Sequence, residues 1–409
     1  FWGGGVDLKK GVPRAGLKTL LGGVNSHSFV YSPSKSLHRC CLFKVIFSKI
    51  MMASTALQFG RRALSSAAAP VVAIVGSTGA VGQELITLME ERSFAASEVR
   101  LLASARSAGK TNYVKGHGDV VVQELTEDSF AGVDIAFFSA GGGQSLQYAP
   151  IAGKAGCVVI DNSSAFRMDP ECPLVVPEIN GEACLGDLPK NIIANPNCST
   201  ILALMCVYPI HKAKGVKRMV VSTYQAASGA GAVAMAELEQ QAADWVAKEP
   251  ITQDFFGRQY VFNLFSHNSD IDAETGYNEE ELKMVKETHK ILNDTSVAVT
   301  ATCIRVPVLR AHCESINLEL EQPCTVEEAH ALLDAFPGVT VQDDRVANIH
   351  PEPLSASGVD DCLVGRVRND ISRANPAYGL DMFMAGDQIR KGAALNAIQI
   401  AELLVANRK

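Results

Sequence analysis

The stretch Val71-Val-Ala-Ile-Val-Gly76-Ser-Thr-Gly79-Ala-Val-Gly82 decides the fold of the first half of the chain. Five consecutive apolar residues predict a buried strand, the glycines predict a tight loop, and Gln83 to Arg92 has the composition of a helix. This order brings backbone N–H groups and a helix N-terminus up to a pyrophosphate. A GxxGxxG spacing is a weak signal alone, and a plain tight turn is the alternative, but the flanking elements favour nucleotide binding.

Further short strands follow this motif, separated by turn-like or helix-like segments. They are predicted at residues 99–103, 120–122, 134–138, 157–160 and 192–194. Such alternation is typical of a doubly wound parallel sheet, in which ligands bind outside the carboxyl ends of the strands. The sequence therefore predicts an α/β fold that begins with a Rossmann-type doubly wound parallel sheet.

The segment after the second predicted strand indicates which dinucleotide binds. An NAD site places an acidic residue here to accept the ribose 2′-OH. The chain instead reads Ser104-Ala-Arg106-Ser107-Ala-Gly109-Lys110. A cation and a hydroxyl suit a 2′-phosphate, so we predict NADP(H) as the cofactor; the alternative is that Arg106 is a solvated loop charge.

Cys198 is the candidate nucleophile. It lies in Asn195-Pro-Asn-Cys-Ser-Thr200, where a predicted strand turns into an apolar helix. Free N–H groups and the positive end of the helix dipole favour the thiolate there and can bind an oxyanion. The alternative is that Cys198 is one more small buried residue among 11 cysteines.

The second half of the chain has a different pattern. Its longer, half-polar strands, at 216–223, 300–306, 314–320 and 362–368, predict a mixed or antiparallel sheet with one face covered by helices. Helices are predicted at 233–247, 279–292, 326–336 and 390–405. Ala394, Ile398, Ala401 and Val405 form one stripe of the last helix, which we expect to pack on the first domain. The domains are predicted at 70–197, completed by 386–409, and at 198–385.

Composition excludes several classes of protein. Residues 1–69 hold ten Lys/Arg and the single acid Asp7, a charge of +9, which leaves −16 of the total −7 for residues 70–409 and argues against a nucleic-acid partner. No apolar run reaches the length of a membrane span, and no cysteine spacing implies a metal site.

The basic, Ser- and Ala-rich head, residues 1–69, is interpreted as a disordered leader of the organellar transit type. A basic tail with another use is the alternative.

A nicotinamide-type domain and a thiolate at a helix start together suggest one reaction class. An aldehyde is oxidised, or an activated acyl group reduced, through a thioester on cysteine. Such a site needs a proton shuttle, and we select His312 because it lies just before a predicted strand and close to Arg305, which could hold a carboxylate bidentately. A structural role for His312 is the alternative.

Six motifs together resemble the aspartate-semialdehyde dehydrogenase family, in order and from about residue 70 to the C-terminus. They are Gly76-Ser-Thr-Gly-Ala-Val-Gly82, Asp161-Asn-Ser-Ser164, Asn195-Pro-Asn-Cys-Ser-Thr200, Gln225-Ala-Ala-Ser-Gly-Ala-Gly231, Glu280-Glu-Leu-Lys283 and Arg390-Lys-Gly-Ala-Ala394. The resemblance implies reduction of 4-phospho-L-aspartate to L-aspartate 4-semialdehyde by NADPH, in the biosynthesis of lysine, threonine, methionine and isoleucine. It also implies a homodimer or homotetramer built through the second, α+β domain, and a plastid location, with the mitochondrion as the alternative.

The resemblance also implies a role for each matching residue. Cys198 would form the thioester and His312 would act as general acid/base. The substrate's α-carboxylate would be held by Arg305, its ammonium by Glu280 and its phosphate by Arg167 and Lys283, with Gln225 and Asn197 beside the thiol. NADP would be contacted by Gly76, Ser77, Thr78, Gly79, Ala80, Val81, Arg106, Ser107, Ser228, Gly229 and Gln388. At position 388 asparagine is the more usual residue of the family.

Two other functions remain open on the sequence. N-acetyl-glutamyl-phosphate reductase performs the same chemistry on a longer acid, but that family resembles Asn-Pro-Gly-Cys-Tyr around its thiol, whereas this chain has Asn197 and Ser199 beside Cys198. A non-catalytic paralogue, a dimeric binding or scaffolding protein, would have lost the nucleophile. Cys198, His312, Arg305 and Gln225 are all present.

Overall fold

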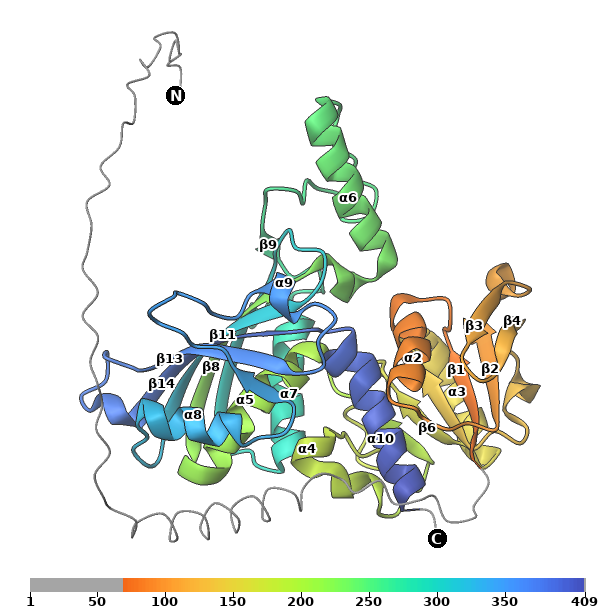
Figure 1. Ribbon diagram of the computed structural model, residues 1–409, viewed down its shortest axis with the longest axis horizontal. Helices are drawn as coiled ribbons and strands as arrows, with labels where there is room; N and C mark the ends of the chain where they lie inside the picture. Colours follow the sequence, from red (N-terminus) through yellow and green to blue (C-terminus); the bar gives the residue numbers. More distant parts are fainter. Residues whose placement is uncertain (1–68, 408–409) are drawn as a thin grey trace, which may run out of the picture. The chain divides into compact units, whose positions relative to one another are not determined.

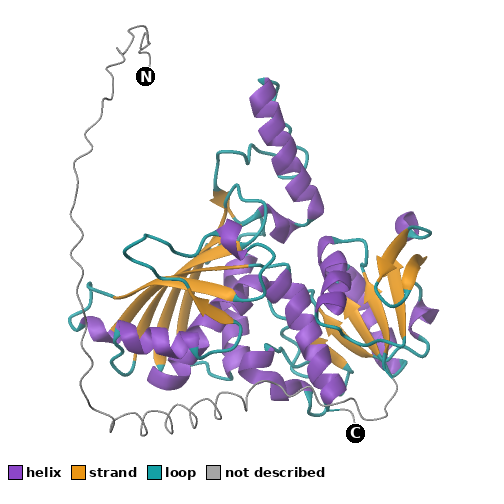
Figure 2. Ribbon diagram, in the orientation of Figure 1, coloured by secondary structure: helices purple, strands orange, loops and turns teal. Residues whose placement is uncertain are grey.

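The computed structural model describes residues 69–407, which form two seven-stranded sheets and the helices around them (Figures 1 and 2). The predicted leader, residues 1–69, lies outside the described residues except for its last residue. The strands of the first sheet, in spatial order, are β3 (Thr111–Val114), β4 (Gly118–Glu124), β2 (Glu98–Ala103), β1 (Val71–Val75), β5 (Ile135–Phe138), β6 (Val158–Asp161) and β7 (Ile192–Ala194).

The first sheet is the predicted Rossmann-type sheet with one addition. Every pair from β4 through β2, β1, β5 and β6 to β7 is parallel, so the prediction of a doubly wound parallel sheet is confirmed. Strand β3 was not predicted, and it pairs antiparallel with β4. Gly116 and Gly118, at φ of +84° and +73°, make the tight turn of this edge hairpin, because glycine adopts positive φ without a steric penalty.

The second sheet is mixed, as predicted. Its order is β12 (Val339–Val341), β13 (Cys362–Asn369), β14 (Gly379–Gly386), β11 (His312–Leu320), β8 (Val216–Gln225), β10 (Ala298–Arg305) and β9 (Phe265–Ser266). The pairs β8–β10 and β12–β13 are parallel, whereas β11 is antiparallel to both β8 and β14. Helices α5 (Cys198–Lys214), α7 (Glu279–Leu292) and α8 (Val326–Asp334) cover one face (Figure 1).

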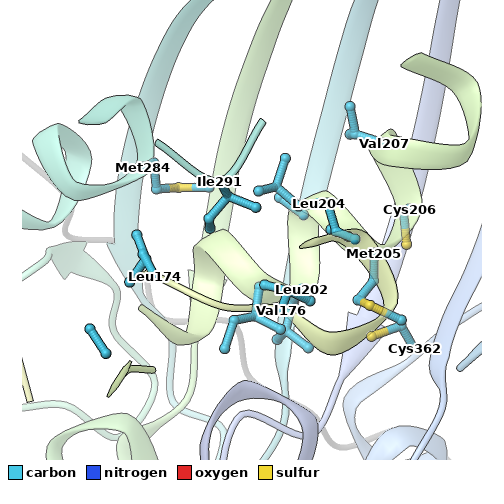
Figure 3. Packing of buried hydrophobic residues seen from close by; sticks show 14 of the residues in the cluster. Leu174, Val176, Leu202, Leu204, Met205, Cys206, Val207, Met284, Ile291 and Cys362 are labelled. Atoms are coloured by element: carbon cyan, nitrogen blue, oxygen red, sulfur yellow. The ribbon is translucent and has the colours of Figure 1, made fainter. Parts of the chain in front are cut away.

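Helix α5 is buried on all sides from Ser199 to Val207 and belongs to the cores of both halves. Its apolar side chains, such as Leu204 and Met205, are fully buried. They belong to one buried cluster with Val176 from the first half and Met284 from α7 (Figure 3). A helix that is apolar all round packs in a core instead of at a surface. Burial on every side fixes the N-terminus of α5 firmly between the two sheets.

The C-terminal segment returns to the first sheet. Helix α10 (Leu395–Ala406) places Ile398 and Ala401 in one cluster with Ile74 and with Leu85 of α2. The predicted single helix from 390 is interrupted, because Arg390–Ala394 forms a π-helical turn. Asp387 stabilises the entry to this turn, since its Oδ1 accepts from the N–H groups of Ile389 and Arg390 at 2.9 and 3.1 Å.

The other helices are α2 (Ala80–Glu91), α3 (Gly142–Lys154), α4 (Pro177–Asn180), α6 (Ala232–Ala247) and α9 (Pro353–Ala356). Among residues 69–407, no helix has the length and apolar character that a membrane span requires.

Candidate active site

Three polar side chains form a row at one end of the second sheet. Arg305 on β10 lies opposite Gln225 on β8. On β11, Cys313 lies opposite Tyr224 of β8, so the preceding residue, His312, lies opposite Gln225. Because side chains alternate between the faces of a sheet, Arg305, Gln225 and His312 all point to the helix-covered face. They are 3%, 1% and 0% exposed, respectively. The sheet register therefore brings together three predicted site residues from distant parts of the chain.

Cys198 is the first residue of α5, directly after the turn that follows β7. Asn197 caps this helix: its Oδ1 accepts from the N–H groups of Ser199 and Thr200 at 3.0 and 3.3 Å. The π-turn packs over the thiol so closely that a Cβ on Gly392 would lie 2.8 Å from the Cβ of Cys198. The thiol thus lies at a helix N-terminus, with glycine required in the segment that covers it.

Glu280 joins the row on the sheet to the start of α5. Its Oε1 accepts from Asn197 Nδ2 at 2.8 Å and from Gln225 Nε2 at 3.3 Å. Gln225 Nε2 also donates to Ser199 Oγ at 2.9 Å. Glu280, Asn197 and Gln225, all predicted substrate ligands, therefore form one hydrogen-bonded group around the helix start that carries Cys198.

The thiol of Cys198 is less acidic than the sequence suggested. Burial raises its pKa to about 12, and the Glu280 carboxylate adds to the rise, while Arg167 and Arg305 act in the opposite direction. The helix N-terminus favours the thiolate, but the desolvation of the charged form outweighs it. In the site without substrate the sulfur is therefore a neutral thiol, contrary to the expectation of a thiolate.

His312 is held in one tautomer by a backbone hydrogen bond. The N–H of Ala226 donates to Nδ1 of His312 at 3.0 Å, so the proton of the neutral ring is on Nε2. Nε2 is buried and has no partner among the described residues. Burial and the nearby Arg305 charge place the pKa of His312 well below its usual value. The resting site thus presents a neutral imidazole with a free N–H donor.

Arg305 is held by three of its five N–H donors. Nε donates to Asn268 Oδ1 at 3.1 Å, Nη1 to the carbonyl of Ala226 at 3.0 Å, and Nη2 contacts His267 Nε2 at 2.7 Å. Burial lowers the pKa of His267 to about 4, so this imidazole is neutral, and its Nε2 accepts from the guanidinium in the tautomer whose Nδ1–H donates to Ser269 Oγ at 3.0 Å. Arg305 is therefore fixed in place while two N–H groups remain for a carboxylate.

Glu280 stays charged although it is buried. Desolvation opposes ionisation, but the charge of Lys283 and the hydrogen bonds from Asn197 and Lys283 favour the carboxylate, so the pKa of Glu280 lies below the ordinary value of a glutamate. Lys283 Nζ lies 3.1 Å from Glu280 Oε2. The site therefore contains a buried anion beside the buried cation Arg305, which matches a substrate that carries both an ammonium and a carboxylate.

Arg167 and Lys283, the predicted phosphate ligands, line one pocket of about 230 Å³ together with Lys286. Arg167 is itself buried and held: it pairs with Glu287 at 3.0 Å, and its Nε donates to the carbonyl of Asn195 at 2.9 Å. The pair with Glu287 was not predicted from the sequence. An arginine so held can still offer its remaining N–H groups to an anion in the pocket.

The glycine loop has the geometry that a dinucleotide phosphate needs. A Cβ on Gly76, at φ of +85°, would lie 2.7 Å from the Ser139 carbonyl oxygen, and one on Gly82 would lie 2.3 Å from the Gly76 carbonyl oxygen. Helix α2 begins at Ala80 without a side-chain cap, which leaves its first N–H groups for an anion. The chain around this loop therefore fits the diphosphate of a dinucleotide.

The other predicted cofactor residues lie at three places. Thr78 and Gly79 are exposed at the loop, Ala80 and Val81 begin α2, and Ser77 is buried beneath it. Arg106 is exposed and Ser107 buried in the turn after β2. Beside the catalytic row, Gln388 donates to the Oγ of Ser228 and accepts from the N–H of Ala311 at 2.9 Å. A Cβ on Gly229 would lie 2.9 Å from both Arg305 Nη1 and His312 Nε2.

Some residues of the site were not predicted. His267 and Asn268 hold Arg305, and Tyr260 donates from its hydroxyl to the carbonyl of Val306 just after β10. They lie in a loop without periodicity, so no pattern marks them in the sequence. Gly392 belongs to a motif that the sequence had marked, but its contact with Cys198 appears only in the folded chain.

Comparisons with known proteins agree with this geometry. The family profile described as "Semialdehyde dehydrogenase, NAD binding domain" matches residues 71–186, and the profile "Semialdehyde dehydrogenase, dimerisation domain" matches 207–391. Curated relatives named aspartate-semialdehyde dehydrogenase are 52% identical in Synechocystis sp. (82% of this chain, 97% of the relative) and 49% identical in Prochlorococcus marinus (82% and 95%). A crystal structure described as aspartate semialdehyde dehydrogenase II complexed with ASA, from Vibrio cholerae, has a TM-score of 0.80 and 44% identity over 84% of this chain and 100% of that chain.

Proposed function

The chain belongs to the aspartate-semialdehyde dehydrogenase family of oxidoreductases, and from this membership we propose its specific reaction. It is the NADPH-dependent reductive dephosphorylation of 4-phospho-L-aspartate to L-aspartate 4-semialdehyde through a thioester on Cys198. Its place is the biosynthesis of lysine, threonine, methionine and isoleucine. The observation that supports it best is the group of Cys198, Glu280, Arg305 and His312 around the start of α5, described above.

The site residues match the charges of this substrate. Arg305 keeps two N–H donors for the α-carboxylate, and the ionised Glu280 receives the ammonium. The phosphate fits the pocket that Arg167 and Lys283 line. Gln225 lies between Glu280 and the helix that carries Cys198, where it aligns the acyl group.

The chemistry follows from that alignment. The Cys198 sulfur attacks the acyl carbon, the bond from this carbon to the phosphate oxygen breaks, and the thiol proton leaves with the phosphate as hydrogen phosphate, so that a thioester forms. A nicotinamide cofactor held at the glycine loop would supply the hydride. The Nε2–H group of His312 donates to the oxygen on which negative charge develops and shuttles a proton as general acid/base when the hemithioacetal collapses and frees the thiol. The unpartnered Nε2 beside Gly229 supports this assignment.

The preference for NADP rests on the turn after β2. Arg106 is exposed there, with Ser107 beside it and no acidic residue in the turn. A cation at this position attracts a 2′-phosphate. We expect Arg106→Ala to raise the KM for NADP by about tenfold while the KM for NAD stays unchanged, since one charge-assisted contact contributes about 1.5–3 kcal/mol. Equal changes for both dinucleotides would contradict the assignment.

Dimer formation and location complete the proposal. The face of the second sheet that α5, α7 and α8 do not cover exposes part of Tyr224 beside the ring of Phe383, which suits a partner copy of this sheet. Light scattering of the purified protein tests the homodimer or homotetramer.

The basic, Ser-rich composition of residues 1–69 supports import into the plastid, or alternatively the mitochondrion, which imaging of a fluorescent fusion tests.

The deciding experiment is phosphate-dependent reduction of NADP with aspartate semialdehyde by the purified protein. We expect Cys198→Ala to abolish turnover, while Cys206→Ala, on the same helix but in the core, keeps turnover within about threefold of the parent. Activity only with N-acetyl-glutamate semialdehyde would leave the thioester chemistry and replace the substrate. Inactivity with both, despite NADPH binding, would support a non-catalytic protein.

A further inference from the structure

Both catalytic residues are held by irregular backbone segments. Ala311, which directly precedes His312, has a φ of +71°, a left-handed conformation that L-residues rarely adopt. The second segment is the π-turn Arg390–Ala394, whose Gly392 touches Cys198. Local preference does not maintain either conformation, so each depends on contacts made elsewhere in the fold.

A single carboxylate anchors both segments. Glu84 Oε2 lies 2.9 Å from Nη2 of Arg310, the residue before Ala311. Glu84 Oε1 lies 2.7 Å from Nε of Arg390, the first residue of the π-turn. Each oxygen of Glu84 therefore serves one guanidinium. The side chains of Glu84 and Arg390 are only 13% and 10% exposed, so this pair is poorly screened by solvent, whereas Arg310 is 28% exposed.

The position of Glu84 in the chain links these two ion pairs to the glycine loop. It is the fifth residue of α2, the helix whose uncapped N-terminus follows the glycine loop. A helix is stiff, so Glu84 moves together with that loop. Glu91 lies on the same helix and pairs with Arg390 at 2.6 Å, but among the described residues it makes no pair with Arg310. Glu84 is thus the carboxylate of α2 that reaches both catalytic segments.

We propose that Glu84 is a positioning residue of the reaction: through Arg310 and Arg390 it holds His312 and Cys198 in register with the cofactor-binding helix. For the reaction it serves, this inference rests on the proposed function, whereas the contacts themselves do not. Arg310 also pairs with Asp387 at 2.7 Å. Loss of Glu84 therefore loosens the His312 segment without freeing it, and the site is misaligned instead of unfolded.

The first test compares Glu84→Gln with the matched control Glu91→Gln, using the full chain. A small displacement of catalytic groups affects the chemical step most strongly. We expect Glu84→Gln to lower kcat by about tenfold or more with the KM for aspartate semialdehyde within about threefold of the parent. Glu91→Gln should stay within about twofold in both. Equal losses in the two variants, or none in Glu84→Gln, would overturn the proposal.

The second test needs no substrate, so it separates this inference from the proposed function. Alkylation by iodoacetamide is followed by mass spectrometry at the nine cysteines of the described residues. Arg390 keeps its pairs with Glu91 and Asp360, so the π-turn is loosened without being freed. Cys198 is already partly exposed and should become more accessible, so we expect Glu84→Gln to alkylate it several-fold faster while the other eight cysteines, which are buried, stay protected. Arg310→Gln, which leaves the pair between Glu84 and Arg390 intact, should lower kcat without this effect. The inference would be contradicted if Glu84→Gln were alkylated at the parental rate, or if Arg310→Gln accelerated alkylation equally. Inactivity of the parent protein would instead contradict the proposed function.

Discussion

At the scale of single residues, the site depends on close backbone approach. Gly229 leaves room for two functional groups, since a Cβ there would lie 2.9 Å from Arg305 Nη1 and from His312 Nε2. Both side chains are buried and held by hydrogen bonds, so neither can yield without moving its partner. The row formed by Arg305, Gln225 and His312 thus has no space for even one extra methyl group.

A substitution at Gly229 tests this lack of space. We expect Gly229→Ala to lower kcat/KM by about 10²-fold, because a displacement of about 1 Å at reacting groups costs that much. Gly186→Ala is the control, since a Cβ at Gly186 meets nothing within 4 Å and its φ is not positive. Steady-state kinetics and thermal melts of both variants provide the check. Near-normal kinetics of Gly229→Ala would show that the row adjusts freely.

The acidity of Cys198 gives a second prediction at this scale. Burial raises the pKa of its thiol to about 12, above the ordinary value of a cysteine. The neutral thiol therefore dominates at neutral pH, and the reactive thiolate fraction grows about tenfold per pH unit. We expect the rate of Cys198 alkylation in the free protein to rise continuously from pH 7 to pH 9.5. A plateau above pH 8 would mean that the helix N-terminus outweighs desolvation.

At the scale of elements, the cap of α5 has two tasks. Asn197 accepts from two N–H groups of the helix and donates to Glu280 at 2.8 Å. Thr325 caps α8 in the same way, by accepting from Glu328 N at 3.2 Å, but it lies outside the site. We expect Asn197→Ala and Thr325→Ala each to lower the free energy of unfolding by about 1 kcal/mol. Only Asn197→Ala should also lower kcat, by about tenfold or more. Denaturant melts and kinetics would contradict this dual role if both variants kept full activity.

The elements also show what the sequence could predict. The glycine loop, the βα alternation and the turn before Cys198 are local patterns, and the predicted elements formed there. Strand β14, Gly379–Gly386, was missed although it pairs with both β11 and β13, because its glycine ends read as loop. The π-turn was missed because the contacts that its residues make, such as that of Gly392 with Cys198 and that of Arg390 with Glu84, join residues far apart in the chain.

The candidate site divides in the same way. Cys198 and the motif residues could be found because their types and spacing carry chemistry. The restraints on them could not: Glu287 holds Arg167, and His267 holds Arg305, across long stretches of chain. The acidity of the thiol was wrongly predicted for the same reason, since burial is a property of the packed fold and not of the local helix start.

At the scale of the whole molecule, one core spans both halves. A single cluster contains Val75 of the first sheet, Leu204 of α5 and Met384 of the second sheet. The two halves should therefore unfold together, in one cooperative transition. This shared core also contains a group whose burial opposes folding, the carboxyl of Glu314 on β11. It is 0% exposed, and neither of its oxygens has a hydrogen-bond partner among the described residues.

Glu314 should make the stability of the protein depend on pH. Burial raises its pKa well above the ordinary value, so the folded state keeps a proton that the unfolded state loses above about pH 4.3. The folded state then binds more protons, and this contribution to stability decreases as pH rises. A glutamine of similar shape does not titrate. We therefore expect Glu314→Gln to become progressively more stable relative to the parent as pH rises from 5 to 8, by at most about 1.4 kcal/mol per pH unit.

Urea unfolding of both proteins across this range measures the difference. Glu319→Gln is the control, because Glu319 lies on the same strand with a partly exposed side chain that pairs with Arg373 at 2.8 Å. Its folded-state pKa is lowered, chiefly by the hydrogen bond from Arg373, so any effect it has is confined to pH near or below the ordinary value of a glutamate and should be absent between pH 5 and pH 8. If Glu314→Gln followed the parent across the same range, the carboxyl would be ionised in the folded state. An ionised Glu314 would need a compensating partner, and the core of the second sheet would then have to contain a charge pair.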